Sequence, residues 1–253
     1  MLRRVRISIP LLILFLVLPF FVVFFLSFVT QYHFPQLWPT EFTLQHWKDL
    51  FGIQSGLGNS FLTSTTLAIS VALFVTSFGF FTSKYIANHV RKEQLMVLAY
   101  LPFILSPVIY GAFLRFYFVS IGLSGQLLGV VIAQVILLYP FSIILFNSFW
   151  DNRLRSFEDL TATLGGNQWQ TFVKVLLPVS KPIILLCFFQ TFLLSWFEYG
   201  MTSVIGIGKV ETLTIRVFYY VGEANVYFAA LASSLLVLPP LLLLYINKKF
   251  VFR

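Results

Sequence analysis

Six long apolar stretches limit what this chain can fold into. They cover approximately residues 8–30, 57–84, 95–118, 127–150, 182–204 and 226–247. Each can cross a ~30 Å hydrocarbon core as a helix that rises ~1.5 Å per residue. Charged residues make up 10% of the chain, far below the ~25% of soluble domains. We therefore predict an all-α, polytopic membrane helical bundle with about six transmembrane helices, forming one transmembrane domain over residues 1–253.

Prolines interrupt some of these stretches. Pro102 and Pro107 lie within 95–118, which makes that stretch the least suited to form one straight helix. Pro140 is also expected to bend its helix, because proline lacks the N–H that the helical ladder requires. Such breaks persist in a membrane where neighbouring helices bond the freed carbonyls. The pattern indicates a packed bundle rather than isolated helices.

The basic residues divide unequally between the two sides of the membrane. With the N-terminus inside, 13 of the 17 Lys and Arg residues fall in inside segments and 4 in outside segments. Cytoplasmic loops carry such an excess of positive charge. We therefore predict cytoplasmic N- and C-termini and a cytoplasmic segment 151–181. The charges are spread over short segments rather than gathered on one face, so the lipid bilayer is the expected surroundings and no nucleic-acid partner is indicated.

The long polar interruption at 156–178 has the pattern of two short capped helices. Ser156 is expected to cap the first helix, with Glu158 and Asp159 in a first turn where the helix dipole favours negative charge. Gly165-Gly166 predicts the left-handed conformation that ends a helix. The apolar residues of this helix recur at helical spacing, which gives it one apolar side: Leu154, Phe157, Leu160 and Leu164. A short helix of this kind outside the bilayer predicts a docking partner.

The second helix of the interruption has its own boundaries. Asn167 and Gln170 repeat the N-terminal cap pattern. Pro178 disfavours a helical conformation at Leu177 and is therefore expected to close the unit.

Residue patterns typical of catalytic sites do not occur in this sequence. The chain has three histidines, His33, His46 and His89, which are scattered, and its one cysteine is Cys187. No zinc-protease motif, cysteine–histidine cluster or Gly-rich phosphate loop ending in Gly-Lys-Ser/Thr is found in the sequence. We therefore predict that the chain is not an enzyme and holds no metal or cofactor. Any chemical energy that it uses must come from a partner.

The cytoplasmic interruption resembles the loop of ATP-binding-cassette (ABC) importer permeases of the binding-protein-dependent type. That loop reads Glu-Ala-Ala, three residues, Gly, and about nine residues to an apolar-x-Leu-Pro ending. Here residues 159–161 (Asp-Leu-Thr) stand for Glu-Ala-Ala, Gly165 is the glycine, and residues 175–178 (Val-Leu-Leu-Pro) form the ending. The acid is one carbon shorter than in the family, and leucine and threonine replace two alanines. Asn59-Ser60 also resembles the family's usual start of the second span.

The resemblance implies that the loop forms a coupling helix that docks into a cleft of a cytoplasmic ABC ATPase dimer. The residues that it assigns to this contact are Glu158, Asp159, Leu160, Thr161, Leu164, Gly165, Gly166 and Pro178. It also implies a second permease chain, identical or paralogous, and an extracytoplasmic substrate-binding protein. ATP and Mg²⁺ would be bound by the ATPase, and the location would be a bacterial-type inner membrane. The alternative is a stand-alone secondary transporter or channel, which normally shows inverted repeats and intramembrane ionisable groups.

Glu198 and its neighbour Tyr199 are the candidate residues of a substrate pathway. The stretch 195–214 resembles permeases of the polyamine, ferric-iron and oxyanion branches, and sugar-type permeases stay open. A carboxylate near mid-bilayer is costly, so Glu198 should face the bundle interior or a wet cavity. Three interpretations stay open. Glu198 pairs with hydroxyls or with a base such as Arg115, it lines the pathway and favours a cationic substrate, or it lies nearer an aqueous end.

Overall fold

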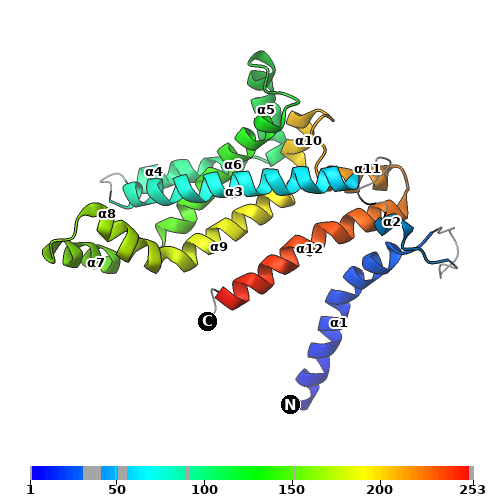
Figure 1. Ribbon diagram of the computed structural model, residues 1–253, viewed down its shortest axis with the longest axis horizontal. Coiled ribbons are helices and arrows are strands. Elements are labelled where there is room, and N and C mark those ends of the chain that lie inside the picture. Colours follow the sequence, from blue (N-terminus) through cyan, green and yellow to red (C-terminus); the bar gives the residue numbers. More distant parts are fainter. Residues whose placement is uncertain are drawn as a thin grey trace. The chain divides into compact units, whose positions relative to one another are not determined.

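The structure, a computed structural model, describes residues 2–30, 41–48, 50, 56–88, 92–150 and 152–250, and its elements are helices (Figure 1). In chain order they are α1 (Leu2–Leu26), α2 (Gln45–Lys48), α3 (Leu57–Ala87), α4 (Lys92–Tyr100), η2 (Leu101–Ile104), α5 (Pro107–Ser120), α6 (Leu127–Asn147), α7 (Asn152–Thr163), α8 (Gln168–Thr171), η3 (Phe172–Leu176), α9 (Leu177–Trp196), α10 (Gly200–Gly206), α11 (Leu213–Gly222) and α12 (Val226–Phe250). The predicted all-α class is confirmed.

Among the described residues, four helices are long and apolar enough to cross a membrane. They are Leu57–Ala87, Leu127–Asn147, Gln168–Trp196 and Val226–Tyr245. A fifth crossing results if the bent pair Lys92–Ile104 and Pro107–Ser120 is counted as one, and Val17–Leu26 is a shorter apolar helix. The polytopic architecture agrees with the sequence analysis, whereas the count of six stays a prediction.

The helix pair at 92–120 bends by 96°. Leu105 and Ser106 are extended, with ψ angles of 145° and 142°, and Pro107 then begins α5. The residue before a proline avoids helical geometry because the proline ring would collide with it. The expectation that this stretch is not one straight helix is therefore confirmed. Pro140, by contrast, lies inside the continuous helix α6.

The predicted fifth span, 182–204, is not one continuous helix. The chain is helical from Gln168 to Trp196, leaves the helix, and starts again as α10 at Gly200. Phe197 has a ψ angle of 0° and Tyr199 a φ angle of −116°. This break places Glu198 between two helices rather than midway along one.

The helices group into two compact units. The first consists of residues 1–64 and 211–241. In it, the Trp47 ring stacks on Phe28 at 5.7 Å and its indole N–H donates to the Ser27 hydroxyl at 3.2 Å. The Leu213 amide donates to the Ser64 hydroxyl at 2.7 Å, which fixes the start of α11 against α3.

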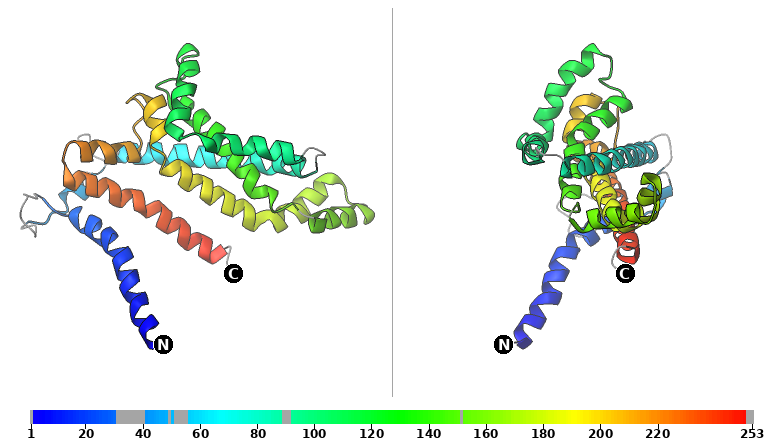
Figure 2. Two further views of the ribbon diagram at one scale, coloured as in Figure 1. Left: turned by 180° about the vertical axis from the view of Figure 1, so that it is seen from behind. Right: turned by 90° about the vertical axis from the view of Figure 1, so that its left-hand side faces the viewer.

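The second unit consists of residues 65–210 and 242–253. Its core is formed by buried apolar residues of α3, α5, α6 and α10 with the turn after α10, namely Leu67, Val71, Val75, Phe118, Val130, Ala133, Leu137, Leu138, Met201, Ile205 and Val210. α10 packs against α5 (Figure 2). α3 and α6 approach closely at Gly79, where an added Cβ would lie 1.8 Å from the Ser142 hydroxyl oxygen. Small residues permit such close helix packing in membranes.

Candidate functional site

The predicted coupling loop forms two helices in the second unit, but its first helix starts earlier than expected. α7 begins at Asn152, so Ser156 lies inside the helix and is not its cap. The prediction of Ser156 as the N-cap is wrong, and Glu158 and Asp159 are in the middle of the helix. Leu154 lies in the turn before Ser156 and only 6% of its surface is exposed. Burial of this apolar side chain favours a helix that extends past Ser156 toward the N-terminus.

α7 ends where the two glycines predict. Gly165 has a φ angle of +80°, the left-handed conformation that glycine adopts without steric cost. The Gly166 amide donates to the Thr161 carbonyl at 2.9 Å and the Gly165 amide to the Ala162 carbonyl at 3.0 Å, which is the Schellman pattern. An added Cβ at Gly166 would lie 2.7 Å from Thr161 Cγ2, so the chain also needs a small residue there.

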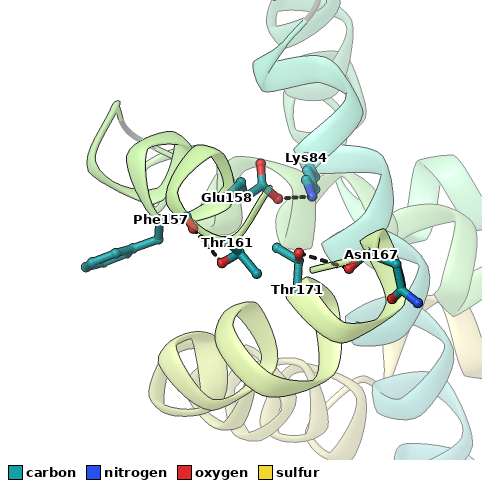
Figure 3. Close-up of polar contacts among 6 residues, drawn as sticks. All are labelled: Lys84, Phe157, Glu158, Thr161, Asn167 and Thr171. Carbon is teal, nitrogen blue, oxygen red and sulfur yellow. Dashed lines mark hydrogen bonds and ion pairs between the residues drawn. The ribbon is translucent and has the colours of Figure 1, made fainter. Parts of the chain in front are cut away.

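α8 starts with the predicted reciprocal cap. Asn167 Oδ1 accepts from the Gln170 amide at 2.8 Å, and Gln170 Oε1 accepts from the Asn167 amide at 3.1 Å. The Thr171 hydroxyl donates back to the Asn167 carbonyl at 3.0 Å (Figure 3). These bonds satisfy the free amides of a helix start, so α8 has a defined beginning despite its short length.

Pro178 does not close the loop as predicted. Leu177 is helical, with φ −62° and ψ −46°, and the chain runs without interruption from α8 through η3 into α9. η3 is a π-helical turn that ends two residues before the proline. In it, the Leu177 amide donates to the Phe172 carbonyl five residues back, and this wider turn gives the proline ring room beside the preceding carbonyls. The helix therefore continues through a residue that normally ends one.

The apolar side of α7 is divided between burial and exposure. Leu154 is buried and Phe157 is half-buried, whereas Leu160 and Leu164 are 57% and 80% exposed. On α8, Trp169 is 71% exposed. We call Leu160, Leu164 and Trp169 the exposed apolar surface of the loop. Thr161 turns inward, and its hydroxyl donates to the Phe157 carbonyl at 2.7 Å (Figure 3).

Glu158 faces its own chain rather than the exposed apolar surface. Its carboxylate forms an ion pair with Lys84, near the end of α3 (Figure 3). Asp159 is exposed. A cavity of about 430 Å³ lies beside the ion pair, with a lining that includes Lys84, Glu158, Asp159, Gly166, Gln168 and Phe172. From the sequence, Lys84 was one of the basic residues that predicted the orientation in the membrane, and its contact with Glu158 was not predicted.

Glu198 binds the start of α10. Its carboxylate accepts from the Met201 amide at 2.6 Å, from the Thr202 amide at 2.9 Å and from the Thr202 hydroxyl. Gln134, buried in α6, donates to the same carboxylate at 3.4 Å and to the Thr202 hydroxyl at 2.9 Å. This arrangement corresponds to the interpretation in which Glu198 pairs with hydroxyls. The partners are polar groups of α6 and α10, not Arg115.

Tyr199 is 38% exposed and lines a cavity of about 670 Å³ together with Glu198. The cavity lies between the α9–α10 break and the start of α5, and its other lining residues are Pro107, Val108, Gln190, Leu193, Leu194, Phe197 and Gly200. A role of Glu198 and Tyr199 in a substrate pathway stays a prediction. Gln134 was missed from sequence, although a lone glutamine within an apolar span was the signal that could have identified it.

In the described part of the chain, no group of three or more His, Cys, Asp or Glu side chains is placed to hold a metal ion.

The fold and loop define a class: a polytopic, all-α membrane protein in which a short helix and a glycine turn precede a membrane-length helix. No family model matches the chain. It is 25% identical over 107 residues to the putative ferric transport system permease protein FbpB 1 of Haemophilus influenzae, covering 42% of this chain and 17% of that protein. It is 31% identical over 160 residues to sulfate permease 2, chloroplastic, of Chlamydomonas reinhardtii, covering 57% and 43%. Both matches span less than half of the relative's own length.

A further relative matches over most of both chains. The inner membrane ABC transporter permease protein YcjP of Escherichia coli is 21% identical over 250 residues, covering 92% of this chain and 87% of that protein. Among solved structures, a chain of the crystal structure of a bacterial ABC transporter involved in the import of the acidic polysaccharide alginate has the same fold. The TM-score is 0.63, with 14% identity over 97% of this chain and 94% of the other. The resemblance is thereby confirmed: the relatives of this chain are ABC transporter permeases, and its fold matches that of a chain of an ABC importer.

Proposed function

We propose that this chain is the transmembrane permease subunit of an ABC importer, in which it forms half of the translocation pathway and couples to cytoplasmic ATPase subunits. The observation that carries the proposal is the exposed apolar surface of α7 and α8. It lies on α7 and on the first turn of the membrane-length helix Gln168–Trp196, on either side of the glycine turn. The permease relatives support the same reading.

Solvent exposure of the loop leucines is unfavourable unless a partner covers them. Leu164 is 80% exposed at the end of α7, beside the Schellman turn that fixes its position. Full burial of one leucine side chain contributes about 1.5–3 kcal/mol. A partner cleft that covers Leu160, Leu164 and Trp169 would therefore gain several kcal/mol from three side chains, with polar residues forming the rim.

The partners follow from this assignment. We expect a cytoplasmic ABC ATPase dimer that binds ATP and Mg²⁺, a second permease chain, and an extracytoplasmic substrate-binding protein. ATP hydrolysis is assigned to the ATPase, and this chain supplies the coupling surface and the membrane helices. The proposed location is a bacterial-type inner membrane with both termini in the cytoplasm.

The docking surface can be tested with two matched charge insertions. In Leu164→Glu, a charge replaces an 80% exposed leucine on α7, and in Ile121→Glu it replaces a 64% exposed isoleucine after α5. We expect the tagged wild-type chain and Ile121→Glu to purify with an ABC ATPase, and Leu164→Glu to insert into the membrane without it. Equal ATPase recovery with both variants would contradict the assignment of the loop. Transport by the purified chain with no ATPase would favour the stand-alone transporter instead.

A further inference from the structure

We propose that Lys84 is a positioning residue that attaches the coupling helix α7 to the membrane helix α3, so that displacement of α7 reaches α3 through the Lys84–Glu158 ion pair. This inference rests on the proposed function above and adds a specific route from the docking loop into the helix bundle.

The contact joins residues that are distant in the sequence. Lys84 lies in the last turn of α3, and Glu158 lies in the middle of α7 (Figure 3). Their side chains are 31% and 28% exposed, so the pair is at the edge of the fold rather than free in solvent. The lysine ammonium also lies 5.9 Å from the centre of the Trp150 ring, within the range of a cation–π contact.

Trp150, which lies shortly before α7 in the sequence, contacts the same end of α3. Its indole N–H donates to the Ser83 hydroxyl at 2.8 Å, and its ring lies 5.0 Å from that of Phe80. Lys84 therefore contacts both the approach to α7, through Trp150, and α7 itself, through Glu158. The last turn of α3 is fixed to the loop at two successive positions, Ser83 and Lys84.

In the middle of α7, residues 157–161 are half-buried or exposed, and α7 packs against α8 and η3. Leu160 and Leu164 point outward, and the space beside Glu158 is the cavity of about 430 Å³ described above. Leu154 packs near the start of α7, and Gly166 contacts Thr161 near its end. Between these points, the Lys84–Glu158 ion pair connects the middle of α7 to α3.

The ion pair between Lys84 and Glu158 can be removed without unfolding the chain. A partly exposed ion pair contributes little to global stability, so neutralising it should leave the fold intact. Lys84→Met keeps the apolar stem of the side chain and removes the charge, whereas Lys84→Arg keeps the charge and can still bond a carboxylate. Any change specific to Lys84→Met and Glu158→Gln then reports on the contact rather than on folding.

The experiment uses the complex of the chain with its co-purifying ATPase in lipid nanodiscs. Nitroxide labels are placed at Thr163→Cys on α7 and at Phe78→Cys on α3, in a Cys187→Ser background. EPR spectra are recorded with and without ATP and vanadate. With Lys84 intact we expect both labels to respond. In Lys84→Met and in Glu158→Gln we expect the α7 response to persist and the α3 response to be lost. Lys84→Arg should retain both responses, as should the control Lys181→Met, which removes an exposed charge of α9.

Three results would overturn the inference: an α3 response that persists in Lys84→Met, loss of the α7 response with the ATPase still bound, or failure of Lys84→Arg to retain the α3 response. Failure of the wild-type chain to bring down any ATPase is a different outcome. It would refute the proposed function itself and remove the basis of the inference.

Discussion

Replacing Glu198 by glutamine separates a structural role from a substrate role. The carboxylate accepts the backbone amide of Met201 on one oxygen and the amide and hydroxyl of Thr202 on the other. Met201 and Thr202 are fully buried, so water cannot replace these bonds. The charge also lies at the start of α10, where free N–H groups favour an anion.

The cost of the substitution follows from the number of acceptors. Glutamine offers one oxygen where glutamate offers two, and its NH₂ group is a donor. If the side-chain oxygen of the glutamine faces Thr202, its NH₂ group faces the Met201 N–H. In the flipped orientation, the NH₂ group faces the Thr202 N–H. Either orientation leaves one buried backbone donor without an acceptor, which costs about 1–3 kcal/mol. A loss of about 2 kcal/mol corresponds to a fall in Tm of about 4–8 °C for a chain of this length.

Thermal unfolding of the purified chain in detergent measures this effect. We expect a lower Tm for Glu198→Gln and an unchanged Tm for Gln190→Leu, which alters another side chain of the same cavity. A direct substrate role predicts a different result. Both variants would then impair transport, and both would melt at the wild-type temperature. A Glu198→Gln chain that melts with the wild type would refute the capping argument.

Three further predictions concern backbone strain, packing and topology. Gly165→Val should lower ATPase recovery, because a β-branched residue at φ +80° costs about 1–2 kcal/mol and disturbs the loop turn. The control Gly122→Val, at φ +73° and away from the loop, should preserve ATPase recovery. Gly79→Ala should destabilise the chain by about 1–3 kcal/mol in thermal unfolding, and Ser142→Gly in the same chain should relieve most of that cost, since the new methyl group meets the Ser142 side chain. A cysteine at position 249 should resist membrane-impermeant maleimide in intact cells, and labelling there would contradict the predicted cytoplasmic C-terminus.

The helix boundaries of the loop show which local signals the sequence carries reliably. Gly165 and the Asn167–Gln170 pair were predicted correctly, because each acts through bonds to residues at most four positions away. Ser156 was assigned wrongly as a cap, although serine favours that position. The observed helix also includes Leu154, which is buried in the folded chain, and this burial is a tertiary effect that serine's local preference does not report. Local propensity predicts a boundary only where tertiary packing does not outweigh it.

The contacts that define the candidate site are long-range, and they were not predicted. Hydropathy identified α6 as a span, but not that Gln134 within it would meet Glu198 and Thr202. The same holds for Lys84 and Glu158, whose charges were assigned to topology and to a helix start. In each case the residue types were conspicuous, and their pairing required knowledge of which helices are neighbours. Fold class was predictable from composition and length alone because lipid restricts the available structures.

Pro178 and Gly165 together determine how movement of the loop would reach the membrane helices. Gly165 breaks the helix between α7 and α8, so no continuous helix joins these two elements. Pro178 does not break the next helix, because the π-helical turn at 172–176 carries the chain through it. A displacement of α8 is therefore transmitted to α9 along a continuous helix. No continuous helix leads from α7 into a membrane helix, and the Glu158–Lys84 ion pair connects α7 directly to α3. On the proposed function, loss of Lys84 should then leave the α8–α9 route intact, and the complex should be weakened in coupling rather than inactive.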